Sequence, residues 1–65
     1  MTFAKLTDKN GESITLNLGV AQMWEKFVST EDEDRDLNTI IWFSPDDVVH
    51  VKEKKELVDL KVGII

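Results

Sequence analysis

The sequence predicts a mainly β domain, in which a small, bent antiparallel sheet or partial barrel of four to five strands is followed by a short C-terminal helix. Three observations predict this fold. Alternating apolar segments flank an Asn-Gly pair, a second pair of such segments flanks a Ser-Pro-Asp-Asp turn, and charged residues near the C-terminus enclose apolar residues at helical spacing. The 65 residues contain no repeat, low-complexity tract or linker, so we expect a single domain.

Residues 2–7 and 12–18 are predicted to form the first hairpin. The turn between them contains Asn10 and Gly11, and Asn-Gly is the strongest short-range hairpin signal. Side chains alternate between the two faces of a strand, so one face is predicted to pack in the core and the other to be exposed to solvent. The side chains expected on the core face are Ala4, Leu6, Ile14, Leu16 and Leu18.

Residues 20–30 carry conflicting signals. The apolar positions Val20, Met23, Trp24, Phe27 and Val28 have the i, i+3, i+4 spacing of an amphipathic helix, which Asn17 is placed to cap. The end of the segment, Phe-Val-Ser-Thr, favours a strand instead. Periodicity alone favours the helix, but both interpretations stay open on the residues themselves.

Residues 37–43 form the most informative segment, because a strand here has large apolar side chains on both faces. Alternation places Leu37, Ile41 and Phe43 on one face, and Ile40 and Trp42 on the other. A small domain covers only one such face well. The other face requires a helix, the far wall of a barrel, or another copy of the chain.

The remaining elements follow from turn and helix signals. Pro45 presets a turn between the strand at residues 37–43 and a partner strand at residues 48–52. Residues 53–61 lack strand alternation and suit a short helix, which Gly63 is placed to end. The apolar ending Ile64 and Ile65 is then expected to dock on a neighbour.

Size and charge narrow the classes of function. A chain of 65 residues buries only about 60% of its unfolded surface, and without cysteine it has neither disulfides nor thiolate zinc sites, so self-association is the remaining source of stability. The net charge of -5 repels phosphates, so direct nucleic-acid binding is not expected. No apolar run is long enough to span a membrane and no signal peptide is evident, so we expect a cytoplasmic protein.

No segment has the pattern of a catalytic, metal or cofactor site. Asp32, Asp34 and Asp36 alternate as in a calcium loop, but Leu37 replaces the required glycine and Phe43 the final acidic ligand. The single histidine, His50, has no second ligand or nucleophile marked beside it. We therefore expect a solvated acidic loop, no metal, no cofactor and no enzymatic activity.

Binding residues are predicted in three alternative sets. The first is a surface that contacts a protein partner or a second copy of the chain, through Trp24, Trp42, Phe43, Ile64 and Ile65. The second is a site between subunits for a small anionic ligand, formed by His50, Lys52, Lys54 and Lys55. The third is the acidic loop at residues 31–36, which would occupy a basic nucleic-acid site on another protein, as phage-type acidic inhibitors do.

Several short motifs also resemble a known family. The motifs are Lys5-Leu-Thr7, Asn10-Gly11, Leu16-Asn17, Ile40-Ile41 and Val51-Lys-Glu53, followed by an apolar-spaced helix. In this order they resemble the small flagellar and swarming-motility proteins of FlbD type and their uncharacterised relatives, although Leu18-Gly19 stands where that pattern has proline-aspartate. The resemblance implies a strand within residues 20–30. It also implies a non-enzymatic accessory or regulatory protein that acts through contacts with other proteins.

Overall fold

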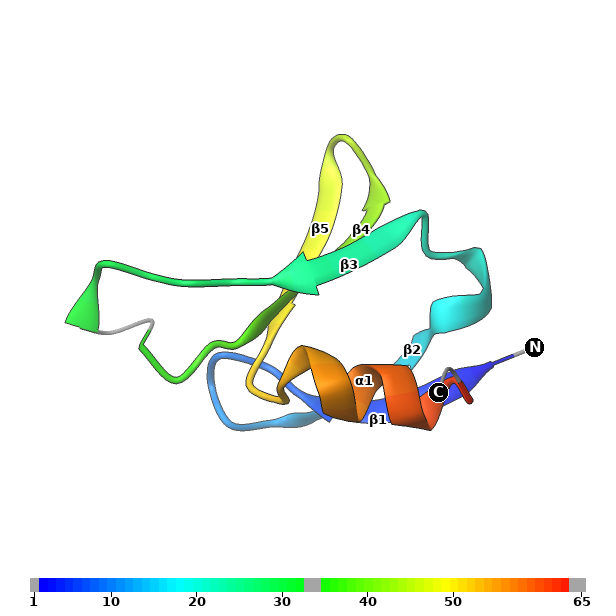
Figure 1. The fold of residues 1–65 in the computed structure, drawn as a ribbon, viewed down its shortest axis with the longest axis horizontal. Helices are drawn as coiled ribbons and strands as arrows, with labels where there is room; N and C mark the ends of the chain where they lie inside the picture. The colour runs from blue at the N-terminus through cyan, green and yellow to red at the C-terminus, as the bar shows by residue number, and fades with distance from the viewer. Residues whose placement is uncertain (1, 33–34, 64–65) are drawn as a thin grey trace.

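Five strands and one α-helix form within residues 2–32 and 35–63, the part of the chain that the computed structural model describes (Figure 1). The elements are β1 (Phe3–Thr7), β2 (Ser13–Asn17), the 3-10 turn η1 (Leu18–Val20), β3 (Met23–Lys26), β4 (Thr39–Ser44), β5 (Asp47–Val51) and α1 (Lys55–Lys61). Strands β1 and β2 form one antiparallel sheet, and β3, β4 and β5 form a second in that order. The predicted mainly β fold with a short C-terminal helix is confirmed, with its strands divided between two sheets.

The first hairpin is held by its turn as well as by its ladder. The Asp8 carboxylate accepts hydrogen bonds from the backbone N–H groups of Asn10 and Glu12, at 2.9 and 3.0 Å. Gly11 has φ of +81°, a conformation that side chains disfavour. The register pairs Ala4 with Leu16 and Leu6 with Ile14, which places the predicted apolar set on one face. This hairpin prediction is confirmed.

Residues 20–30 contain a strand, so the helical interpretation of their spacing is wrong. Met23–Lys26 pairs with β4 in a register that sets Trp24 beside Ile41. The Gln22 and Phe27 N–H groups extend the ladder by donating to the carbonyls of Trp42 and Asn38, at 2.8 and 2.9 Å. Pairing with a distant strand has overridden a local periodicity that was too short to decide the structure. Asn17 does act as a cap, but for η1, where its side chain accepts from Gly19 N–H at 3.1 Å.

The second hairpin and the helix form close to where the sequence predicts them. A tight turn pairs Ser44 with Asp47, and the ladder is irregular between Trp42 and Ser44. The helix α1 ends at Lys61, and Gly63 follows with φ of +83° and donates its N–H to the Leu60 carbonyl at 3.1 Å. The predicted docking of Ile64 and Ile65 falls outside the described residues.

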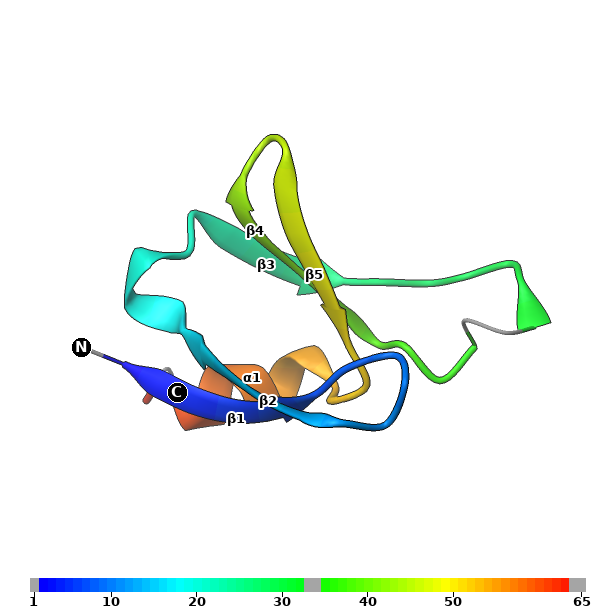
Figure 2. The same cartoon turned by 180° about the vertical axis from the view of Figure 1, so that it is seen from behind.

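The core lies where the two sheets and the helix meet. Leu6, Ile41, Val51 and Val58 come from β1, β4, β5 and α1, and each is at most 1% exposed. Seen from behind, α1 lies alongside β1 and β2, with the three-stranded sheet on the other side of the core (Figure 2). Only one face of the three-stranded sheet therefore contributes to the core.

Polar contacts fix the junction between the two sheets. The Glu53 carboxylate, between β5 and α1, accepts from the Thr7 backbone N–H at 2.8 Å and from the Thr7 hydroxyl at 2.9 Å. The fully buried Thr39 donates its hydroxyl to the Glu53 carbonyl at 2.7 Å. Lys52 N–H donates to the Thr7 carbonyl at 2.9 Å. Glu53 thus ties the end of β1 to the start of β4.

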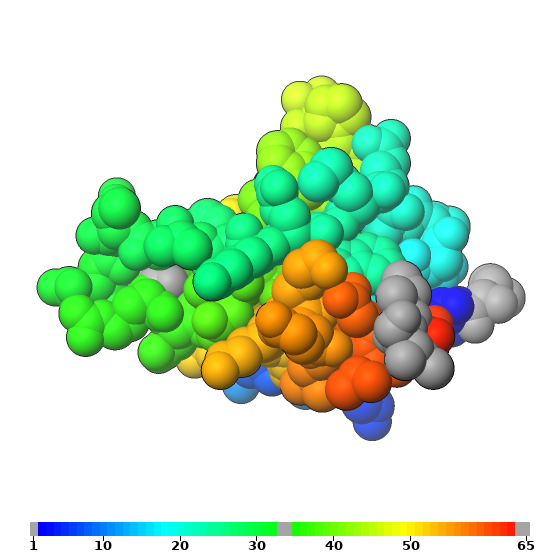
Figure 3. All heavy atoms as spheres, viewed as in Figure 1, coloured from blue at the N-terminus to red at the C-terminus, as the bar shows by residue number. Residues whose placement is uncertain are grey.

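The segment between β3 and β4 projects from the rest of the molecule, to the left in Figures 1 and 3. It includes the predicted acidic loop, whose Asp32 forms an exposed ion pair with Arg35 at 2.6 Å. Asp34 lies outside the described residues. The described residues of the loop, Glu31, Asp32, Arg35 and Asp36, are all exposed, so this part of the loop is solvated, as predicted.

Candidate interaction surface

The face of the three-stranded sheet that points away from the core is the candidate functional surface. Strand register assigns its residues in two rows that cross β3, β4 and β5. One row is Met23, Trp42 and Val48, and the other is Glu25, Ile40 and His50. We call these six residues the outer face. The opposite side, with Trp24, Ile41 and Val49, is the inner face.

The outer face is apolar at four of its six positions, and its two ionisable residues, Glu25 and His50, lie on the edge strands. Its apolar side chains, unlike those of the inner face, are not among the partly buried residues that pack against the core. Met23, on the edge strand β3, is 47% exposed, while Ile40, Trp42 and Val48 are partly buried. Within the described chain, the Trp42 Nε1–H is buried and has no hydrogen-bond acceptor.

Phe27 extends this apolar surface beyond the end of β3. Its ring meets the His50 imidazole edge-on, with centroids 4.7 Å apart and planes at 76°. Such edge-to-face contacts are favourable for rings with opposite charge on face and edge. The contact places the His50 imidazole at the rim of the outer face.

The two tryptophans have different surroundings. Trp24 packs against the core and donates its Nε1–H to Asp59 of α1 at 2.8 Å. The other Asp59 oxygen accepts from Lys55 Nζ at 2.9 Å. These hydrogen bonds, chiefly that from Lys55 and then that from Trp24, lower the pKa of Asp59 from its ordinary value. The contact fastens α1 to β3, so Trp24 is a structural residue and Trp42 is the tryptophan of the outer face.

The predicted partner-binding residues therefore do not form a single surface. Trp42 lies on the outer face, whereas Trp24 and Phe43 pack against the core. Ile64 and Ile65 lie outside the described residues. Met23, Glu25 and Val48 also belong to the surface, and they are not predicted from the sequence because their placement depends on a strand register between distant segments. The strand-favouring end of the segment, Phe27 to Thr30, was the available signal, and helical spacing obscured it.

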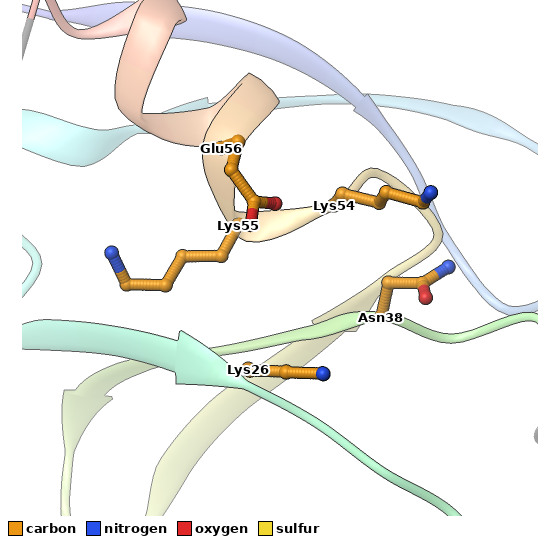
Figure 4. A pocket seen from close by; sticks show the side chains of 5 residues that line it. All are labelled: Lys26, Asn38, Lys54, Lys55 and Glu56. Carbon is orange, nitrogen blue, oxygen red and sulfur yellow. The ribbon is translucent and has the colours of Figure 1, made fainter. Parts of the chain in front are cut away.

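The predicted anion-binding residues are also separated. Lys54 and Lys55 line an open pocket of about 340 Å³, together with Lys26, Asn38 and Glu56 (Figure 4). His50 and Lys52 do not line it. The Lys54 and Lys55 amino groups point in opposite directions, and Lys55 is already paired with Asp59. The pocket is cationic, but its amino groups do not converge on one point.

The Ser29 and Ser44 side chains have local structural roles. Ser44 Oγ accepts from the backbone N–H of Asp46 at 3.3 Å in the β4–β5 turn, and Ser29 Oγ accepts from that of Glu31 at 3.1 Å. Among residues 2–32 and 35–63, no three His, Cys, Asp or Glu side chains are grouped closely enough to hold a metal ion. No helix in the described chain has the length and apolar character needed to cross a membrane.

Comparison with known proteins finds no matching family model, no matching curated protein and no matching solved structure.

Proposed function

We propose that the protein is a small, non-enzymatic interaction module that acts through protein–protein contacts and self-associates through its outer face. The observation that carries the proposal is the apolar row Met23, Trp42 and Val48, which strand register places on the side of the sheet away from the core. Covering such a row removes apolar surface from water, which is the main driving force of most protein association.

The small area of the outer face limits the affinity of this self-association. Strands about 4.8 Å apart that rise about 3.4 Å per residue give a face of about 14 by 14 Å for three strands and four residues. This footprint of about 200 Å² is small against the roughly 800 Å² that each partner buries in a standard interface. Self-association through the outer face is therefore weak and reversible, which leaves the same surface accessible to a regulatory target.

Light scattering across a concentration series tests the proposal, with two matched lysine substitutions. Met23→Lys introduces a charge at an exposed outer-face position, and Phe3→Lys does so at an exposed position of β1, where Phe3 is 58% exposed. We expect the wild type and Phe3→Lys to gain mass with concentration and Met23→Lys to remain a monomer. A wild type that is monomeric throughout, or equal losses from both substitutions, would contradict the proposal.

Tryptophan emission supplies an independent measurement in the same samples. In a Trp24→Phe background, the remaining emission comes from Trp42 alone. We expect it to shift to the blue as concentration rises, because a partner removes water from the outer face. A spectrum that does not change while mass increases would place the interface elsewhere on the molecule.

A second candidate function is the binding of a small anion at the lysine pocket. The supporting observation is that Lys26, Lys54 and Lys55 line one pocket of a chain whose net charge is -5. Inorganic phosphate is the first probe, and thermal stability is the readout. Under this hypothesis phosphate stabilises the wild type and a Lys9→Met control, but not Lys54→Met, whereas equal shifts in all three would indicate an effect of ionic strength.

A further inference from the structure

The two ionisable residues of the outer face are arranged symmetrically about its central strand. Glu25 on β3 and His50 on β5 both lie in register with Ile40 on β4, so one row reads acid, apolar, imidazole. The next row has Met23 and Val48 on either side of Trp42. Within one chain, the backbones of Glu25 and His50 are two strand spacings apart, about 10 Å, and the two side chains form no ion pair in the described chain.

We propose that two copies pack outer face to outer face about a two-fold axis parallel to β4, so that Glu25 of each copy pairs with His50 of the other. This inference rests on the proposed self-association and specifies its geometry. Such an axis exchanges the two edges of the sheet, so β3 of one copy lies over β5 of the other. An interface of this kind is isologous, so each pairing occurs twice.

Strand direction makes the arrangement consistent along both rows. Strands β3 and β5 are each antiparallel to β4, so they run in the same direction. When Glu25 lies over the partner's His50, Met23 therefore lies over the partner's Val48. The two central residues, Ile40 and Trp42, meet their own counterparts near the axis. Along the whole face, each Glu25 carboxylate then lies opposite an imidazole donor of His50, and apolar side chains lie opposite apolar side chains.

The chemistry of the pair favours this axis over the alternative. An imidazole carries at least one N–H donor in either protonation state, and a carboxylate accepts it. A two-fold axis perpendicular to the strands would instead stack β3 on β3 and β5 on β5, which separates each carboxylate from the imidazoles. The neighbours of His50 across the sheet include the apolar Ile40 and Phe27, and the Lys52 amino group lies near the Gly11 turn.

A charge reversal and its compensation test the arrangement. His50→Glu places two carboxylates opposite each other twice in the proposed dimer, and we expect self-association to weaken by more than about tenfold. Adding Glu25→Lys to that variant restores both pairs and should restore the affinity. The control is Glu12→Lys in the His50→Glu variant, which changes net charge equally at an exposed position of the first hairpin and should restore nothing.

A second series guards against misfolding of His50→Glu. His50→Lys keeps an N–H donor opposite Glu25 and should associate at least as tightly as the wild type. Adding Glu25→Lys then opposes lysine to lysine and should abolish association. Circular dichroism checks the fold of every variant. If the wild type associates but neither compensation nor this reversal occurs, the two-fold arrangement is wrong and the proposed function stands; a monomeric wild type would overturn both.

Discussion

The inner and outer faces of the three-stranded sheet contain the same residue types but differ in burial. On β4, Ile41 points inward and is completely buried, while its neighbour Ile40 points outward and is only partly buried. Each face also has a tryptophan, and only that of the inner face has a hydrogen-bond acceptor within the described chain. The inner face accounts for folding. The outer face is apolar without contributing to the core, which is the combination expected of a contact surface.

Truncation of the two neighbouring isoleucines tests this contrast and has the largest expected effect. Ile41→Ala removes a buried side chain from the core and should cost about 2–5 kcal/mol of unfolding free energy. Domains of this size rarely have more than about 3–5 kcal/mol, so this variant is expected to be largely unfolded. Ile40→Ala should cost about 1 kcal/mol or less, because its site is partly exposed.

Urea denaturation at low protein concentration, followed by circular dichroism, measures both costs in the monomer. Light scattering of Ile40→Ala at high concentration then measures how much this substitution weakens self-association. We expect this variant to remain folded while its self-association weakens. Similar costs for the two substitutions in the monomer would show that the two faces contribute equally to folding, and the contrast would fail.

The Glu53 junction is the next most important contribution on the inner side. Glu53→Ala leaves the Thr7 N–H and hydroxyl without the carboxylate that accepts both of them. Hydrogen bonds to charged groups contribute about 1.5–3 kcal/mol, so we expect a loss in that range. Glu56→Ala is the control, since Glu56 is exposed on the first turn of α1, and it should change stability by no more than about 0.5 kcal/mol.

An equal effect of the Glu53 and Glu56 substitutions would remove Glu53 from its proposed role in joining the two sheets. Glu53→Gln refines the measurement. It keeps one acceptor oxygen but loses the second, so it should fall between the wild type and Glu53→Ala in urea denaturation.

These contacts also show which parts of the molecule the sequence predicts. Both hairpins were predicted because their turn signals are local, at Asn10-Gly11 and at Pro45, and the helix end was predicted at Gly63. The strand β3 was obscured because its pairing partner lies well beyond it along the chain, after the acidic loop. Local spacing within a short segment does not contain the information that decides between a helix and such a strand.

The candidate site was only partly predictable for the same reason. Alternation along β4 placed Ile40 and Trp42 on a second face, and that placement is confirmed. Which residues join them depends on the register of β3 and β5. The separation of the two tryptophans depends on a hydrogen bond between Trp24 and Asp59, 35 positions apart. No sequence pattern marks a contact at that distance.

Phenylalanine substitutions at the two tryptophans sharpen the comparison with a smaller effect. Both substitutions replace a two-ring indole with a single phenyl ring, so both lose apolar contact of the same type. Trp24→Phe also removes the donor to Asp59, whereas Trp42→Phe removes a buried N–H that has no acceptor in the described chain. Trp24→Phe should therefore cost about 1 kcal/mol more unfolding free energy. The reverse order in urea denaturation of the monomer would show that Trp42 is the structural tryptophan.

Acid unfolding gives the smallest and most specific effect, through Asp59. Lys55 first, and then Trp24, lower the pKa of this carboxyl group in the folded chain below its ordinary value of 3.8. The resulting stabilisation is present above that value and is lost as pH falls through the lower pKa of the folded state, since the unfolded chain then binds the proton more readily. Unfolding free energy measured between about pH 2 and about pH 6 should show this loss in the wild type.

Asp59→Asn should remove this contribution to the pH dependence, Lys55→Met should reduce it strongly, and Trp24→Phe should reduce it less. Because the outer face has no part in this linkage, Trp42→Phe should retain the wild-type slope, and a slope that Trp42→Phe alters as much as Trp24→Phe would contradict the separate roles of the two tryptophans.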